Sequence, residues 1–178
     1  MKKIFVAVAV AALLVCTGSG WATLITIDRV SWHYSGTGGE FNIAGFGATT
    51  NNLYKDGVTL VNGGFESFCL EATEYLPGLG TPNAFNAVIN PDNKAMGGGG
   101  DSNPDVGDTI SRGTAYLYNL FSLGILSGYN YDANDHTVTG RYASAAALQN
   151  TIWWLEDEVG GSVPGTFQSL LITRFGSL

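Results

Sequence analysis

The chain of 178 residues is poor in cysteine, histidine and charge: it has two cysteines, two histidines and 13% charged residues. Only eight residues are lysine or arginine, and the formal charge is −7. This acidic balance argues against nucleic acids and anionic membrane surfaces as partners, because both select for basic patches. The 45% of hydrophobic residues excludes an acid-rich disordered tail. Together with 25 glycines, they indicate a globular protein with many turns, of a length that suits one domain.

The first 22 residues have the pattern of a secretory signal peptide. Two lysines precede an apolar run over residues 4–15, which is too short to span a bilayer as a helix. Small residues within 20–22 mark a cleavage site, so we expect an exported, secreted or surface protein whose mature chain, 23–178, is a single domain without a transmembrane span. Lipidation at Cys16 is the alternative.

Cleavage at this site leaves Cys69 as the one cysteine and lowers the formal charge from −7 to −9, because two lysines and Cys16 are removed. A secreted chain with a single cysteine cannot form an internal disulfide. Its thiol is then expected either to pair with another chain or to have chemistry of its own. On the cysteine count alone, a buried, inert thiol is favoured over both.

The hydrophobic pattern predicts an α+β fold, with an N-terminal antiparallel sheet and two to three helices. The predicted strands cover 23–34, 40–47, 58–61 and 65–71, and the predicted helices cover 109–123, 141–158 and 167–175. Ser111 is expected to cap the first helix, and 156–158 are expected to form a solvated acidic end of the second. Between sheet and helices, the Gly- and Pro-rich residues 77–108 predict a long loop with one short strand at 87–89.

Two short stretches, 65–71 and 145–154, carry the residues most suited to chemistry. Side chains alternate along a strand, so Cys69 faces away from its two apolar neighbours. On the predicted helix, Gln149 lies at the edge of the core stripe beside small alanines, which allow another backbone to approach. A buried amide without partners costs about 1–3 kcal/mol. We therefore expect the Gln149 amide to meet Cys69.

The sequence Phe-Cys-Leu-Glu at 68–71, followed by Leu-Gln-Asn-Thr-Ile-Trp at 148–153, resembles the thioester domain of bacterial surface adhesins. In that family, a cysteine after an aromatic residue and a glutamine before an aliphatic–tryptophan pair join as an internal thioester. The resemblance implies that Cys69 is the thioester cysteine and Gln149 the acyl donor, with no cofactor. It covers two motifs and the order of elements across residues 65–158, not the whole chain.

The function that this resemblance implies is a single covalent attachment to an amine-bearing partner, such as an extracellular protein, rather than enzymatic turnover. Ile152 and Trp153 take the aliphatic and tryptophan places of the motif. Trp153 and Trp154 are predicted to shield the thioester from water. Glu71 is the candidate for tuning the cysteine, but a solvated or hydrogen-bonded carboxylate at the strand edge is the favoured interpretation of this residue. The alternative is a noncatalytic extracellular matrix or surface structural protein with a free thiol at Cys69.

Exported proteins of the exosortase-sorted (PEP-CTERM) type carry the same pair of motifs. They usually end in a Pro-Glu-Pro motif, a membrane span and basic residues. Such an ending does not precede Leu178, so we expect either a truncated chain or release by another route.

Two weaker patterns suggest other chemistry. Asp101, Asn103 and Asp105 resemble a calcium loop but lack its bidentate glutamate, so a plain acidic loop without metal is favoured over calcium. A hydrolase pair of Cys69 and His136 is a third possibility. It is disfavoured because the cysteine lies in an apolar strand rather than at a helix start, where a thiolate is stabilised.

Overall fold

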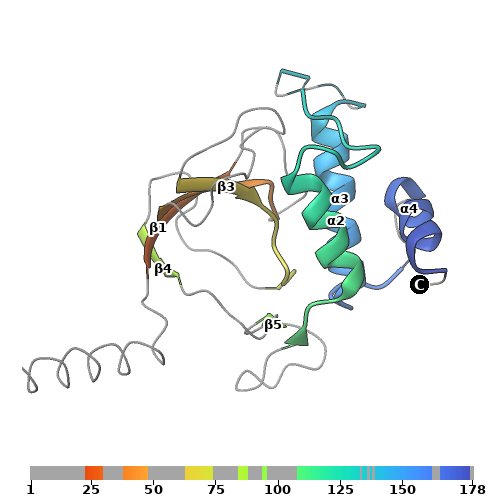
Figure 1. Cartoon of the computed structure of the whole chain (residues 1–178), viewed down its shortest axis with the longest axis horizontal. Coiled ribbons are helices and arrows are strands. Elements are labelled where there is room, and N and C mark those ends of the chain that lie inside the picture. Colours follow the sequence, from red (N-terminus) through yellow and green to blue (C-terminus); the bar gives the residue numbers. More distant parts are fainter. Residues whose placement is uncertain are drawn as a thin grey trace, which may run out of the picture.

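The computed structural model describes residues 23–29, 38–47, 63–73, 84–87, 94–95, 108–132, 134–135, 137, 139–161 and 165–176. The strands are β1 (Thr23–Arg29), β2 (Phe41–Gly47), β3 (Gly63–Ser67), β4 (Ala84–Ala87), β5 (Lys94–Ala95) and β6 (Asp108–Thr109); the helices are α2 (Arg112–Ser122), α3 (Arg141–Leu155) and α4 (Gly165–Phe175). An N-terminal antiparallel sheet and three helices make the fold α+β, as predicted. Figure 1 shows the sheet on one side of the molecule and the helices on the other, with α4 outermost.

The main sheet has the strand order β3-β2-β1-β4, and its neighbouring strands are antiparallel. Ile27 lies opposite Ile43, which in turn lies opposite Phe65. One face of this sheet buries a small cluster of Ile25, Ile27 and Phe41. Because apolar side chains from alternate positions gather on that face, the two-residue period in the sequence was a sound guide to β1 and β2.

Three predicted strands fall partly or wholly outside the described residues. The strand predicted at 58–61 lies outside them, as do positions 30–34 of the first strand. In the loop region, β4 ends at Ala87, where the predicted short strand 87–89 was expected to begin. Residues 88 and 89 are also outside the described part of the chain.

The predicted strand at 65–71 is too long, because β3 ends at Ser67. Pairing with β2 stops where Ser67 lies opposite Phe41. Cys69 therefore lies just beyond the sheet, where its backbone N–H and C=O bind a side chain of α3 rather than a neighbouring strand. The alternation of side chains nevertheless continues: Phe68 and Leu70 pack into the helical core, whereas Cys69 packs against the sheet cluster.

The ends of the helices follow from local hydrogen bonds. The Ser111 hydroxyl accepts the N–H of Thr114 at 3.0 Å, which confirms the predicted cap of α2. The predicted end of the second helix at 158 is wrong, because α3 ends at Leu155 and Asp157 adopts a left-handed backbone with φ of 59°.

The acidic residues after α3 are not simply solvated, as was predicted. The Glu156 carboxylate accepts the N–H of Ser111 at 3.1 Å, and Glu158 Oε2 accepts the N–H of Ala72 at 3.1 Å. Of residues 156–158, Asp157 is exposed and the two glutamates are half-buried. The first N–H groups of a helix lack partners within it, so a carboxylate beside Ser111 also stabilises the start of α2.

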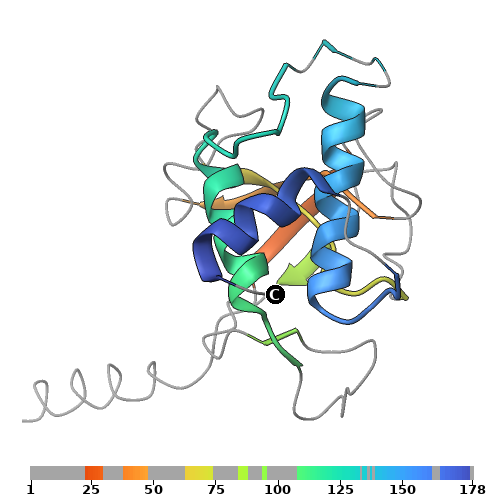
Figure 2. The ribbon, with the colours of Figure 1, turned by 90° about the vertical axis from the view of Figure 1, so that its right-hand side faces the viewer.

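The larger core lies between the three helices and the end of β3. The Phe121 ring is at its centre, with its centroid 4.9 Å from that of Phe68 and 5.0 Å from that of Tyr129. Figure 2 shows α4 lying across α2 and α3, where Phe167 and Leu171 are fully buried. None of the described helices is long and apolar enough to cross a membrane.

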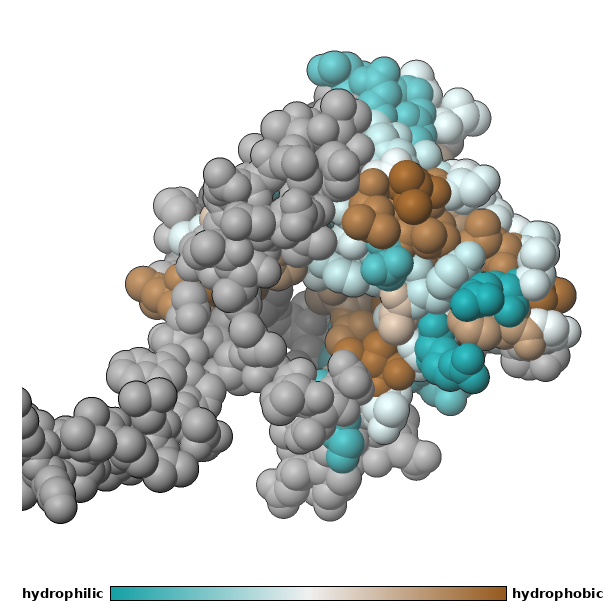
Figure 3. All heavy atoms as spheres, viewed as in Figure 1, coloured by the Kyte–Doolittle hydropathy of each residue, from teal (hydrophilic) through white to brown (hydrophobic). Residues whose placement is uncertain are grey.

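The described surface is mixed in polarity. Figure 3 shows hydrophilic and apolar side chains interspersed over the helical half of one face. Large apolar side chains are exposed in both layers, with Leu24 on β1 and Leu123, Ile125 and Ile172 among the helices. Scattered apolar exposure of this kind is normal for a folded protein and identifies no site by itself.

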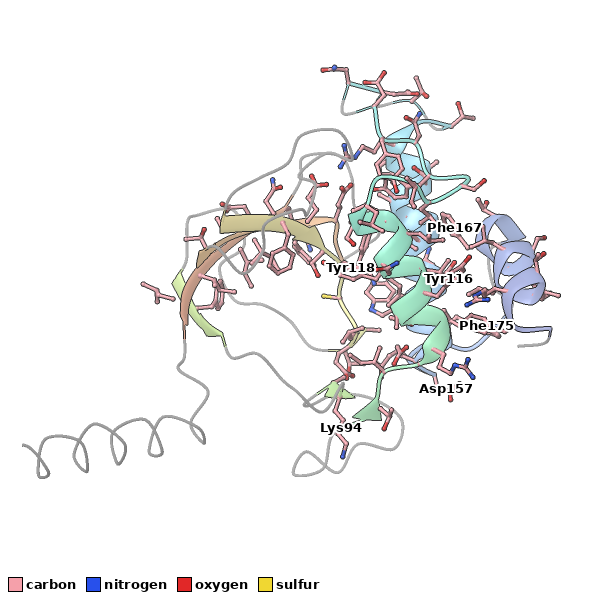
Figure 4. The ribbon with its side chains drawn as sticks, in the orientation of Figure 1. Lys94, Tyr116, Tyr118, Asp157, Phe167 and Phe175 are labelled. Carbon is pink, nitrogen blue, oxygen red and sulfur yellow. The ribbon has the colours of Figure 1, made fainter. Side chains whose placement is uncertain are left out.

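Three tyrosines between the layers have raised pKa values. The Tyr118 hydroxyl donates to the carbonyl oxygen of Glu66 at 3.0 Å, and Figure 4 shows Tyr118 on the side of α2 that faces the sheet. Burial raises the pKa of Tyr118 to about 12 and that of Tyr131 to about 12. Burial and the charge of Glu40 raise the pKa of Tyr129 well above its ordinary value.

We expect the folded protein to lose stability as the pH rises from about 10, the pKa of an unfolded tyrosine, towards 12. The reason is that the folded state keeps these tyrosines neutral while the unfolded state ionises them. Urea unfolding and tyrosinate absorbance across this range test the expectation. The Cys69→Ala variant is used, so that the thiol does not contribute. Full ionisation of all tyrosines near pH 10 in the folded protein would contradict it.

Candidate functional site

The side-chain amide of Gln149 is fully buried and is bound to the backbone at Cys69. Its Oε1 accepts two backbone N–H groups, from Gly39 at 2.9 Å and from Cys69 at 2.9 Å. Its Nε2 donates to the carbonyl oxygen of Cys69 at 2.8 Å. The structure therefore brings together the two residues that the sequence singled out, although they lie 80 positions apart.

The hydrogen bonds also determine which end of the amide is oxygen. With the opposite orientation, the NH₂ group of Gln149 would face the N–H groups of Gly39 and Cys69, and donors would oppose donors. In the observed orientation each end of the amide has a complementary partner. The carbonyl oxygen of Gln149 is consequently held on the side of the two backbone N–H groups.

Two backbone N–H groups that converge on one carbonyl oxygen form the arrangement of an oxyanion hole. Both N···O distances, from Gly39 and from Cys69, are 2.9 Å. Donors of this kind polarise the carbonyl and stabilise the negative charge that develops on its oxygen when a nucleophile attacks the carbon. Two N–H donors in these positions could stabilise an oxyanion at Gln149 Oε1.

Close packing explains why glycine precedes this site. A Cβ atom on Gly38 would lie 2.7 Å from Gln149 Cγ and 2.7 Å from Trp153 Cη2, which is closer than these atoms can approach. In the sequence, Gly38 and Gly39 fall between the predicted strands 23–34 and 40–47, where a turn is the ordinary interpretation. Two adjacent glycines permit a close backbone approach as well as a turn, but the sequence alone does not say what would approach.

The predicted shielding residues have different surroundings. Trp153 is 7% exposed and lies beside Gly38 and Gln149, one helical turn after the glutamine. Its indole N–H has no hydrogen-bond partner in the part of the chain that the structure describes. Trp154 is half-buried, and its indole donates to the carbonyl oxygen of Gly161 at 2.9 Å, beyond the end of α3. Of these two tryptophans, Trp153 is the one that lies beside the Gln149 side chain.

The remaining predicted site residues are outside this arrangement or outside the described chain. Glu71 is half-buried two residues after Cys69, and its tuning role stays a prediction. The weak calcium pattern at Asp101, Asn103 and Asp105 lies outside the described residues, as does His136. Within the described ranges, no cluster of His, Cys, Asp and Glu side chains could hold a metal ion.

A buried charge cluster lies next to the amide site, and sequence reasoning missed it. The Arg141 guanidinium binds both carboxylates of Glu40 and Glu66, with Nε to Glu40 Oε2 at 3.2 Å and Nη2 to Glu66 Oε2 at 2.8 Å. Nη2 also contacts the second oxygen of Glu40, and Nη1 donates to the carbonyl oxygen of Tyr131 at 3.2 Å. The Tyr129 hydroxyl donates to Glu40 Oε2 at 2.8 Å. These partners satisfy groups that burial would otherwise make costly.

The charges of this cluster influence one another strongly. Burial acts to lower the pKa of Arg141, but the hydrogen bonds and negative charge of Glu40 outweigh burial and raise it above the ordinary value. Arg141 therefore stays a cation at every pH at which the protein is folded. No local pattern in the sequence distinguishes Arg141, Glu40 and Glu66 from surface charges, because glutamate and arginine are rarely fully buried.

A cavity of about 670 Å³ lies beside the Cys69 segment, on the side of Phe68 and Leu70. Its lining includes Phe68 and Leu70 from that segment and Tyr118 and Asn119 from α2. The described residues that line it include neither of the two site residues. We therefore assign it no part in chemistry at the amide.

Comparisons with protein-family models, with curated proteins and with solved structures find no match to this chain.

We expect Gly38→Ala to destabilise the protein by about 1–3 kcal/mol, because the new methyl group must displace the Gln149 or Trp153 side chain from a tightly packed site. Gly160→Ala is the matched control, since nothing lies within 4 Å of a Cβ at that position. Urea unfolding of both variants measures the difference. Equal stability of the two variants would contradict the close packing around position 38.

Proposed function

We propose that this chain is an exported protein that forms an internal thioester between Cys69 and Gln149 and uses it once, for covalent attachment to an amine-bearing partner. The observation that carries the proposal is the pair of N–H groups, from Gly39 and Cys69, on the Gln149 carbonyl oxygen. The residue that donates one of these bonds is the one whose thiol would attack. The proposal agrees with the resemblance to thioester domains of bacterial adhesins.

Thioester formation is an acyl transfer within the chain. The Cys69 sulfur attacks the carboxamide carbon of Gln149, and the oxygen takes up negative charge opposite the two N–H donors. The carbon–sulfur bond forms, the carbon–nitrogen bond breaks, and the thiol proton leaves with the nitrogen as ammonia. Glu71 is the proposed group that tunes the thiol.

Burial favours the survival of such a thioester. Hydrolysis requires water at the carbonyl carbon, and the Gln149 side chain is fully buried. The buried indole of Trp153 and the Gln149 side chain both pack against Gly38, so the indole is the proposed shield on that side. Trp154 contributes less to this shielding than the sequence predicted, because its indole is directed to Gly161.

Attachment is the second acyl transfer at the same carbon. A neutral amine of the partner, such as a lysine side chain, attacks the thioester carbonyl; an amide bond to Gln149 forms, the carbon–sulfur bond breaks, and Cys69 recovers its proton. The same two N–H groups would stabilise the oxyanion in this step. Because Gln149 stays bonded to the partner, each molecule reacts only once. A single reaction suits an adhesive surface or secreted protein, whereas an enzyme must turn over repeatedly.

We expect the intact mass of the exported protein to be lower by one ammonia than its sequence predicts, because ammonia leaves when the thioester forms. Mass spectrometry of the folded protein under mildly acidic conditions measures this. Cys69→Ala and Gln149→Ala should each have the mass of its own sequence. An unmodified mass together with a titratable thiol would instead favour the alternative, a noncatalytic structural protein with a free Cys69.

We also expect methylamine to add to the folded protein at Gln149 and to release one thiol, because a small amine opens a thioester by aminolysis. Peptide mapping identifies the modified residue, and thiol titration counts the released Cys69. The Cys69→Ala variant controls for modification elsewhere. Labelling of that variant at Gln149 would contradict a thioester, since an unreacted amide does not exchange with amines under mild conditions.

A further inference from the structure

Both N–H donors on the Gln149 carbonyl belong to segments that are tied to a single arginine. Gly39 immediately precedes Glu40, and Cys69 follows Glu66 by three residues. The carboxylates of Glu40 and Glu66 both bind Arg141, which lies about two turns before Gln149 on α3. The helix that presents the amide thus also holds the two segments that bind it.

The arginine is well suited to this connection. Its planar guanidinium presents several N–H donors in a fixed geometry, so it orients two carboxylates at once. Arg141 and Glu40 are 0% exposed and Glu66 is 3% exposed, so water does not compete for these bonds. The Tyr129 hydroxyl and the Tyr131 carbonyl occupy further positions around the same groups. The direction of each side chain is therefore strongly restricted.

The Cys69 segment is tied to α3 at three points. Glu66 binds Arg141 at the start of the helix, the Cys69 backbone binds Gln149 in its middle, and the N–H of Ala72 binds Glu158 just past its end. A chain from 66 to 72 can span at most about 20 Å when fully extended, which is similar to the roughly 22 Å length of a fifteen-residue helix. The outer two ties fix how far the segment can slide along α3.

We propose that Arg141, through Glu40 and Glu66, is the positioning residue that holds the N–H groups of Gly39 and Cys69 on the Gln149 carbonyl. The consequence for reactivity rests on the thioester proposed above. Two carboxylates share one arginine in a buried place, an arrangement that contributes little to stability compared with packed apolar side chains. The proposed role of the Arg141 cluster is instead to fix the position of the Cys69 segment along α3.

Glu66→Ala is the variant that tests this role most directly. It removes the tie on the Cys69 side but leaves Arg141 paired with Glu40, so no arginine charge is left buried without a partner. Glu66→Gln keeps an acceptor of the same shape and should restore part of the function. Leu171→Ala is the matched control, because it removes a fully buried side chain from α4 and does not touch the charge cluster.

The first measurement is the rate of ammonia loss from protein newly made by cell-free synthesis, followed by intact mass. Glu66→Ala should slow it roughly ten- to hundredfold, the effect of displacing reacting groups by about 1 Å. Glu66→Gln should be slowed several-fold, and Leu171→Ala should react at the unchanged rate despite a lower melting temperature. If Glu66→Ala does not fold, the Glu66→Gln rate decides against the same control.

The second measurement does not require a thioester. In a Cys69→Ala background, hydrogen exchange of the backbone amides at 39 and 69 reports their bonds to Gln149. Adding Glu66→Ala should lower protection at these two positions more than at the core amides of α3, whereas adding Leu171→Ala should lower protection evenly.

The two measurements separate the inference from the proposed function. Normal ammonia loss in Glu66→Ala, or a loss slowed equally in Leu171→Ala, overturns the positioning role and leaves the thioester in place. Absence of ammonia loss from the unmodified protein overturns the thioester. If Glu66→Ala leaves the hydrogen-exchange protection of the amides at 39 and 69 unchanged, the positioning role is overturned, whether or not the intact mass shows ammonia loss.

Discussion

The Gln149 amide has to be satisfied where it lies, and this requirement organises the joint between sheet and helices. A fully buried amide needs a partner for each of its polar ends, and the partners here are backbone groups of Gly39 and Cys69. Those groups reach it where β3 has ended at Ser67 and where Gly38 packs closely against Gln149 and Trp153 of α3. The end of the strand, the glycine pair and the buried position of Gln149 are thus parts of one arrangement.

The same hydrogen bonds that stabilise the folded chain are the ones that the proposed thioester chemistry would use. Backbone N–H groups that satisfy a carbonyl in the ground state would equally stabilise an oxyanion at that oxygen, without further rearrangement. Around them, the cluster of Arg141, Glu40 and Glu66 connects two strands to the helix that carries Gln149. Electrostatics and packing therefore act together on one small region, and the larger aromatic core around Phe121 supports it from the helical side.

Much of the fold could be read from local pattern. Alternating apolar residues located β1 and β2, and Ser111 marked the start of α2. The misplaced ends of β3 and α3 have causes that the local sequence pattern does not reveal. β3 is shorter than predicted because Cys69 pairs with a side chain, and α3 is shorter because Asp157 takes a left-handed conformation. Both depend on partners or turns that tertiary packing imposes.

By itself, the sequence determined that Cys69 and Gln149 deserve to be considered together, because residue type, helical spacing and motif are local properties. The tertiary structure alone decided that Gly39 supplies a second donor and that Arg141 joins Glu40 to Glu66. These partners lie 75 to 110 positions apart along the chain. A charged residue carries no local mark of burial, since whether it is buried depends on which distant group comes to face it.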